Sequence, residues 1–182
     1  MGLLEPASRA GGTRGKKAQV GDGLMHQPAP YRPTTIYIAA DHGGFAVKER
    51  LKVDLAANYQ VKDLGPEALQ PGDDYVPYAK GVGQAVAAEP GSMGILVCRS
   101  GEGMVMAANK IDGIRAALVW DRAIAEETRR DNDSNVLSLP ADHADYDELL
   151  AITKLWLTTP FSGAERHARR INEMTKLEGG EA

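Results

Sequence analysis

The chain has 182 residues, of which 43% are hydrophobic and 25% are charged, and its formal net charge is −4. This composition is typical of one globular domain, and the charge gives no reason to expect nucleic acid or an acidic membrane surface as a partner. No stretch approaches the roughly 20 apolar residues that a membrane span requires, and the first residues lack an apolar signal core, so we expect a soluble protein. A single cysteine cannot form an internal disulfide, which favours the cytoplasm.

Residues 1–34 are rich in glycine, proline, alanine and basic residues and show no sustained apolar period. Such a segment buries too little surface to order itself, so we expect a disordered N-terminal tail over 1–34 and one folded domain over 35–178. Met25 lies inside the tail and is an alternative translational start. The tail is either a docking or targeting arm or an extension without a role.

From Ile36 onward, short apolar runs alternate with longer amphipathic stretches, which is typical of βαβα organisation. The apolar runs predict five strands, at 36–40, 60–64, 93–98, 115–120 and 135–139. The amphipathic stretches predict six helices, at 44–58, 75–88, 103–110, 122–130, 145–157 and 162–177. Right-handed crossovers then give a three-layer α/β/α, Rossmann-like domain with a five-stranded parallel sheet.

The first candidate site follows the first strand. In an open parallel sheet the ligand crevice lies beyond the carboxyl ends of the strands, so the residues just after each strand are the first candidates. Asp41 and His42 supply an acid and an imidazole there, and Gly43 and Gly44 let a ligand approach the backbone. The alternative is that Asp41 caps a helix and that His42 is incidental.

The second candidate site is the segment Cys98-Arg99-Ser100-Gly101-Glu102-Gly103, which follows the third strand. Small residues before a helix leave several amide N–H groups pointing one way, which predicts a site for a phosphate or for a developing enolate oxygen. The helix dipole and Arg99 would favour the thiolate of Cys98. The alternative is a buried cysteine that fills a small space beside a tight turn.

Two further groups of candidate residues do not follow the carboxyl end of a predicted strand. Asp131 and Asn132 come just before the last strand, so they could reach a site only across a subunit interface, and the alternative is a solvated turn. Arg166 and Arg170 stand four residues apart on one helix face, which suits bidentate phosphate binding, and the alternative is a solvated basic face. We expect no metal, because the sequence has no pair of histidines four residues apart or similar ligand spacing.

Five motifs occur in one order along the chain. They are Asp41-His42-Gly43-Gly44-Phe45 with Lys48, Asp74-Tyr75 with Tyr78-Ala79, the Cys98 to Gly103 segment with Ala107-Ala108-Asn109-Lys110 and Gly113-Ile114-Arg115-Ala116, then Asn132-Asp133-Ser134-Asn135-Val136-Leu137, and Arg166-His167 to Arg170. With them, the chain from about residue 36 to residue 178 resembles the ribose-5-phosphate isomerase B family, which also contains the galactose-6-phosphate isomerase subunits.

The resemblance implies an aldose–ketose isomerase of sugar phosphates that works through an enediolate without a cofactor or metal. Cys98 matches the catalytic base. The other matches are Ser100 with the amides of Gly101 and Gly103 for the anion hole, His42, Arg166 and Arg170 for the phosphate, and Asp41, Tyr75 and Asn132 for the sugar. The family's site is shared between subunits, so we expect a homodimer or tetramer in which the neighbour supplies Asp131 and Asn132.

Three positions distinguish this chain within the family. Members without the cysteine use a glutamate where this chain has Met104, so the chain resembles the cysteine type. Asp131 stands where the family has a histidine assigned to ring opening, and an aspartate, with an ordinary pKa of about 3.9, is a poor proton donor at neutral pH unless burial raises its pKa. Asp142 stands where the family has a phosphate-binding arginine and would repel that anion, so we expect Arg99 to restore a positive charge nearby.

The differences keep other functions open. One is isomerisation of a different pentose or hexose phosphate, and another is a non-catalytic subunit that binds a sugar phosphate. A phosphoacceptor receiver domain is also five-stranded, but it requires an aspartate at the end of the third strand, where this chain has Cys98.

Overall fold

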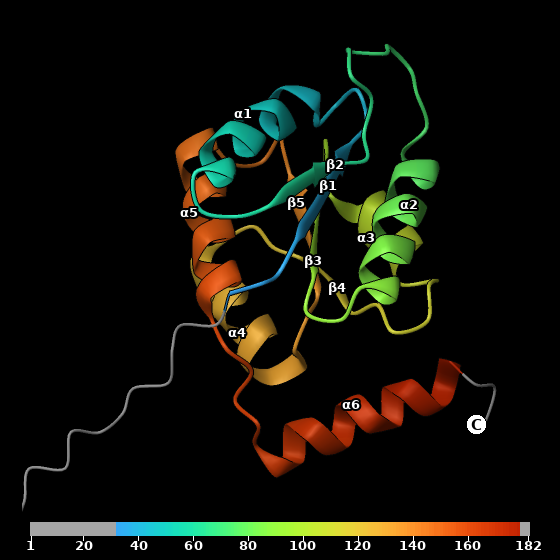
Figure 1. Cartoon of the computed structure of the whole chain (residues 1–182), viewed down its shortest axis with the longest axis vertical. Coiled ribbons are helices and arrows are strands. Elements are labelled where there is room, and N and C mark those ends of the chain that lie inside the picture. Colours follow the sequence, from blue (N-terminus) through green and yellow to red (C-terminus); the bar gives the residue numbers. More distant parts are fainter. Residues whose placement is uncertain (1–31, 179–182) are drawn as a thin grey trace, which may run out of the picture.

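The computed structural model describes residues 32–178, in which strands and helices alternate (Figure 1). The strands are β1 (Ile36–Ala40), β2 (Val61–Asp63), β3 (Met93–Cys98), β4 (Ala116–Leu118) and β5 (Val136–Pro140). The helices are α1 (Phe45–Ala56), α2 (Tyr75–Ala88), α3 (Glu102–Ala108), α4 (Arg122–Asn132), α5 (Tyr146–Thr158) and α6 (Glu165–Glu178). Every expected strand and helix is therefore present, with ends shifted by up to three residues.

Most of the expected tail, residues 1–31, lies outside the described residues. The two residues just before β1 are hydrogen-bonded to the folded domain. The Thr34 N–H donates a hydrogen bond to the Gly91 carbonyl at 3.0 Å, and the Thr35 hydroxyl donates one to the Glu89 carboxylate at 2.5 Å.

The five strands form one sheet in the order β2-β1-β3-β5-β4, and every neighbouring pair is parallel. The central strand β3 is buried along its whole length, as its continuous apolar run requires. Helices cover both faces of the sheet (Figure 1). The expected three-layer α/β/α architecture with a parallel sheet is thus confirmed.

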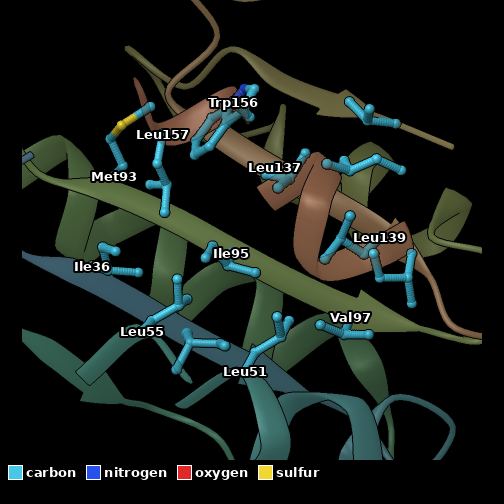
Figure 2. Close-up of a cluster of buried hydrophobic side chains, with 14 of the residues drawn as sticks. Ile36, Leu51, Leu55, Met93, Ile95, Val97, Leu137, Leu139, Trp156 and Leu157 are labelled. Atoms are coloured by element: carbon cyan, nitrogen blue, oxygen red, sulfur yellow. The ribbon is translucent and has the colours of Figure 1, made fainter. Parts of the chain in front are cut away.

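Each face of the sheet packs against its own set of helices. On one face, apolar side chains of α1, α4 and α5 form a core with alternate residues of β1, β3 and β5. Figure 2 shows Leu51 and Leu55 below β3 and Trp156 and Leu157 above it, with Ile95 between them. On the other face, α2 and α3 pack against Ala39, Leu96 and Cys98. These two cores fix the positions at which the strands end.

The register brings three strand ends together at one edge of the sheet. Ala40 of β1 pairs with Val97 of β3, and Cys98 of β3 pairs with Pro140 of β5. The turns that follow β1, β3 and β5 are therefore neighbours, and α6 lies on the opposite side of the molecule (Figure 1).

The segment around Asp131 differs from the expected turn. Helix α4 continues to Asn132, so Asp131 and Asn132 are its last two residues. The helix ends because Asp133 adopts a left-handed conformation, with φ of 48°, and its N–H donates to the Arg129 carbonyl at 3.1 Å. Aspartate adopts this left-handed conformation more readily than most residues. The sequence pattern alone did not show that the helix ends at Asp133 rather than at residue 130.

Arg129 holds this helix end to the rest of the domain. Its guanidinium is almost fully buried and donates to the Asp133 carboxylate at 2.7 Å, to the Ser134 carbonyl at 2.6 Å and to the Thr159 carbonyl at 3.2 Å. These contacts connect α4, β5 and the end of α5. Arg129 therefore determines where Asp131 and Asn132 lie.

We expect Arg129→Met to lower the free energy of unfolding by about 3 kcal/mol, because it leaves buried acceptors and a carboxylate without their partner. Urea denaturation measures the change. The matched control is Arg130→Met, because Arg130 is exposed and pairs with Glu126 one turn away on the same helix. A loss as small as that of Arg130→Met would show that Arg129 does not hold this helix end.

Candidate active site

Asp41 and His42 form the first wall of the site, at the carboxyl end of β1. The buried Asp41 carboxylate accepts hydrogen bonds from the N–H groups of Gly43 and Gly44, at 2.9 and 3.1 Å, so it fixes the turn that leads into α1. The His42 ring is partly exposed, and its Nδ1 lies 2.9 Å from the Asp73 carboxylate. Asp41 fixes the turn before α1 but does not cap the helix, whose N-cap residue is Gly44 without a side-chain cap. His42 has a charged partner that the sequence did not indicate.

Cys98 occupies the carboxyl end of β3 and is 5% exposed. The Gly101 N–H donates a hydrogen bond to its Sγ at 3.1 Å. Gly101 has a φ of 77°, and a Cβ at this position would lie 2.4 Å from Leu118, so the turn around the sulfur requires glycine. The Ser138 hydroxyl donates to the Gly101 carbonyl at 2.7 Å and fixes the turn from below. The sulfur therefore lies beside a tightly packed turn whose Gly101 N–H points at it.

The protonation of Cys98 differs from the sequence expectation. Burial raises the pKa of the thiol above its usual value, and the nearby Asp41 carboxylate adds to the rise. Hydrogen bonds from the backbone of Gly101, Met104 and Ser100 act in the opposite direction but do not outweigh burial. A thiolate with a raised pKa is scarce at neutral pH and, when formed, a stronger base.

We therefore expect the alkylation of Cys98 by iodoacetamide to accelerate with pH well beyond the range of an ordinary thiol. Only the thiolate reacts, so a raised pKa moves the rise in rate to higher pH. The chain has one cysteine, so the rate reports this residue alone. The urea-unfolded chain is the control, with a midpoint near the ordinary value of about 8.5. A native midpoint below that of the unfolded chain would contradict the raised pKa.

Arg99, which was expected to favour the Cys98 thiolate, pairs with Asp142. Its Nε donates to the Asp142 carboxylate at 2.8 Å, and the Asp142 N–H donates to the Arg99 carbonyl at 3.0 Å. Its side chain passes over Gly43, where a Cβ would lie 2.3 Å from Cγ of Arg99. Arg99 and Asp142 therefore neutralise each other at the rim, which offsets the repulsion expected from Asp142 alone.

Tyr75 and Met104 complete the surroundings of the Cys98 loop. Tyr75 begins α2, and its ring lies over Gly103, where a Cβ would come within 3 Å of three ring carbons. Met104 is fully buried between α2 and the sheet, so it presents no polar group to the crevice. Ser100 accepts a hydrogen bond from the Glu102 N–H at 3.3 Å and stands at the start of α3.

A neighbouring hollow was not expected from the sequence. It measures about 590 Å³, and its walls include Ser100, Glu102, Trp120, Pro140 and His143. Trp120 follows the edge strand β4 and is 53% exposed. The available signal was a large aromatic residue at the end of the apolar run 115–120, but the run alone predicts that Trp120 belongs to the strand.

Four expected site residues lie elsewhere in the subunit. Asp131 and Asn132 end α4, and Asp131 lies 3.4 Å from Nδ1 of the buried His167. Arg166 and Arg170 are on α6, and Arg166 donates to Nε2 of His167 at 2.8 Å. Asp131 and Arg166 therefore meet at His167, and helix α6, which also carries Arg170, lies on the side of the molecule away from the turn after β1 (Figure 1).

A second large hollow separates α6 from the body of the domain. It measures about 690 Å³ and lies between Arg115, Thr128 and Asn132 on one side and Met174 and Leu177 on the other. Met174 and Leu177 are exposed apolar residues, so this side of α6 lacks the cover that apolar surface usually has. Within residues 32–178, no cluster of three or more metal-ligating side chains is present and no helix is long and apolar enough to span a membrane.

Residues 36–174 match the model of a family described as Ribose/Galactose Isomerase. The chain belongs to the ribose/galactose isomerase family. This membership confirms the resemblance seen in the motifs and identifies the enzyme as a sugar-phosphate isomerase of the ribose-5-phosphate isomerase B type. A receiver domain is thereby excluded.

Relatives match almost over their entire length. The chain is 42% identical over 144 residues to the probable ribose-5-phosphate isomerase B of Mycoplasma pneumoniae, covering 79% of this chain and 94% of the relative. It is 34% identical to ribose-5-phosphate isomerase B of Mycobacterium tuberculosis, covering 79% and 89%. Its fold matches ribose-5-phosphate isomerase B from Mycoplasma genitalium with bound ribulose-5-phosphate, with a TM-score of 0.77, 35% identity and coverage of 80% and 96%.

Proposed function

We propose that this isomerase interconverts ribose 5-phosphate and ribulose 5-phosphate through an enediolate, with Cys98 as the base. The observation that carries the proposal is the position of the Cys98 sulfur, which sits at the carboxyl end of the central strand with the Gly101 N–H at 3.1 Å. The relatives' names and the bound ribulose-5-phosphate of the Mycoplasma genitalium structure support this choice of substrate.

In the proposed mechanism, Cys98 removes the proton from C2 of the open-chain aldose. Before the transfer the Gly101 N–H stabilises the Cys98 thiolate, and as charge develops on O1, Ser100 and the amide of Gly103 stabilise the oxygen. Return of the proton from Cys98 to C1, together with transfer of the O2–H proton to O1, gives the ketose. This route needs no metal and no cofactor, because the thiolate and the N–H groups supply the base and the positive dipoles.

In this proposal Asp41 and Tyr75 bind the sugar hydroxyls, and His42 follows Asp41 at the end of β1. The pKa of His42 is raised, chiefly by its hydrogen bond to Asp73. A larger imidazolium fraction near neutral pH favours interaction with an anionic substrate. Arg99 adds a side chain at the rim of the same crevice.

We further propose a homodimer or a tetramer in which a second copy supplies Asp131, Asn132, Arg166 and Arg170 to the Cys98 crevice. Two observations support this: these residues lie away from the crevice in their own subunit, and α6 leaves a hollow with exposed apolar side chains beneath it. Asp131 would then occupy the position of a ring-opening acid or base, and the two arginines would bind the phosphate. A reduced thiol is needed, which agrees with a cytoplasmic setting.

A second candidate is an isomerase of a different pentose or hexose phosphate, which the Arg99–Asp142 pair at the rim favours because it changes the charge there. A panel of ribose, allose and galactose phosphates, followed by ketose formation, tests both. We expect fastest turnover of ribose 5-phosphate. Preference for another sugar would support the second candidate, and binding without turnover of any would show a non-catalytic subunit.

A further inference from the structure

Within residues 32–178, His167 is the one histidine whose ring is buried, with 3% of the residue exposed. It lies in the first turn of α6 and has a polar neighbour at each ring nitrogen. The Arg166 Nε–H donates to its Nε2 at 2.8 Å, and its Nδ1 lies 2.9 Å from the Ser162 hydroxyl and 3.4 Å from the Asp131 carboxylate. The ring therefore sits where the start of α6 meets the end of α4.

The contact with Arg166 fixes the protonation of the His167 ring. An arginine side chain only donates hydrogen bonds and keeps its proton in proteins. Nε2 of His167 must therefore accept with its lone pair, and the ring proton is on Nδ1, within hydrogen-bond distance of the Ser162 hydroxyl. The imidazole is thus neutral, and it acts as an acceptor toward Arg166 and as a donor on its other side.

This contact also determines which edge of the Arg166 guanidinium is free. Arg166 is exposed, and its side chain has no other hydrogen bond or ion pair with residues 32–178. Nε is held by His167, so the two terminal Nη groups remain for a ligand. Two parallel N–H donors of one guanidinium are suited to a bidentate contact with a phosphate. The buried ring thus presents the Nη edge of Arg166 to an anion.

Arg170 lies one turn further along α6 and lacks this support. It is exposed, and its guanidinium has no hydrogen bond or ion pair within the described part of the chain. A long side chain loses conformational freedom when it binds a ligand, and a side chain that the protein already holds loses less. Phosphate binding by Arg166 should therefore depend on a neighbouring residue, whereas binding by Arg170 should not.

We propose that His167 is a positioning residue of the phosphate site: its neutral imidazole holds Nε of Arg166, so that the two Nη groups of this arginine bind the phosphate of the substrate. The inference rests on the proposed function, in which Arg166 reaches the Cys98 crevice of a second copy. His167 acts through Arg166 and not on the substrate, because its ring is buried and both nitrogens have partners in their own subunit.

Two substitutions separate this role from a purely structural one, because each keeps a different side of the ring. In His167→Gln, the side-chain oxygen reaches the position of Nε2 and can accept from Arg166. In His167→Asn, the amide reaches only the position of Nδ1, so a contact with Ser162 can remain but Arg166 loses its acceptor. A ring that only joined α6 to α4 would make both variants defective.

We expect His167→Asn to raise KM for ribose 5-phosphate by about three- to tenfold, because Arg166 must then be ordered when the phosphate binds. The kcat should change by less than about twofold, since the phosphate is remote from the carbons that exchange the proton. His167→Gln should restore KM to within about twofold of the wild type. Equal KM values in the two variants, or a change that falls on kcat alone, would show that the acceptor at Nε2 does not position the phosphate ligand.

The same substitution in two arginine backgrounds identifies the residue through which His167 acts. In an Arg166→Ala background, His167→Asn should have no further effect on kcat/KM, whereas in an Arg170→Ala background it should keep its three- to tenfold effect. An effect of equal size in both backgrounds would overturn the proposal.

Titration calorimetry with ribose 5-phosphate gives the same comparison as dissociation constants, without turnover. If the wild type binds this sugar phosphate but isomerises none, the proposed function fails, and the comparison of dissociation constants still decides the role of His167. Absence of any binding by the wild type would overturn both proposals.

Discussion

Cys98→Ala is expected to lower kcat for ribose 5-phosphate by about a thousandfold, because it removes the group that we propose to move the carbon-bound proton. KM should change by less than about threefold, since the sugar and phosphate contacts assigned to Asp41, Tyr75 and the arginines remain. A coupled assay of ribulose 5-phosphate formation measures both constants. The loop should keep its shape, because Ser138 and Leu118 hold Gly101 independently of the sulfur.

Cys98→Ser is the comparison variant, because it keeps a hydrogen-bond acceptor near the Gly101 N–H but replaces the thiol by a much weaker acid. We expect it to remain within about tenfold of Cys98→Ala. Circular dichroism melting excludes unfolding as the cause. Activity of Cys98→Ala within about tenfold of the wild type would show that another group is the base.

Two inactive variants with defects in different parts of the proposed shared site are expected to recover activity when their subunits are mixed. Neither Cys98→Ala alone nor the double variant Arg166→Ala/Arg170→Ala should be active at low substrate concentration. The first lacks the base, and the second lacks two charged hydrogen-bond donors to the phosphate. After subunit exchange in an equimolar mixture, about half the dimers are mixed, and each mixed dimer has one intact site, so about a quarter of wild-type activity should return.

Size-exclusion chromatography and the activity of the mixture measure this together. A mixture of wild type with Cys98→Ala should keep about half of the wild-type activity whether or not subunits exchange, so it controls for the effect of mixing alone. If subunits exchange but the two inactive variants together stay inactive, the crevice does not combine residues of two copies. The cluster of Asp131, Asn132, Arg166 and Arg170 would then be a local feature of its own subunit.

The fold was predictable because the chain alternates patterns of different period. The apolar run at 94–97 indicates a buried parallel strand, and Leu51 and Leu55 indicate a helix face. Strand ends in such a sheet mark the crevice, which is why the sequence alone indicates Cys98, Asp41 and His42 as site residues. The motifs that carry the family resemblance at Asp41 and at Cys98 lie at this same edge of the sheet.

Contacts between distant segments were not predictable in this way. Asp73 and His42 are 31 residues apart, and Arg99 and Asp142 are 43 apart, so no local period links them. Arg99 was expected to favour the Cys98 thiolate, but its guanidinium pairs with Asp142, a residue that the sequence around Cys98 does not indicate. The direction of the thiol pKa also depends on burial, which the sequence around the loop does not reveal.

The end of α4 was also not predictable from the sequence. Polar residues at 130–135 suggested a turn, but the helix continues until Asp133 adopts a positive φ, and the buried Arg129 fixes that geometry from within. A charged residue at a fully buried position breaks the usual pattern of surface arginines. Its partners come from three elements, and only the folded chain brings them together.

The most direct test of the account is the uptake of deuterium at C1 of ribulose 5-phosphate, because this exchange isolates the step assigned to the thiol. Wild-type protein in heavy water should exchange one C1 hydrogen stereospecifically, and Cys98→Ala should show no exchange above the uncatalysed rate. Exchange by Cys98→Ala at the wild-type rate would contradict the central claim and assign the proton transfer to a different residue.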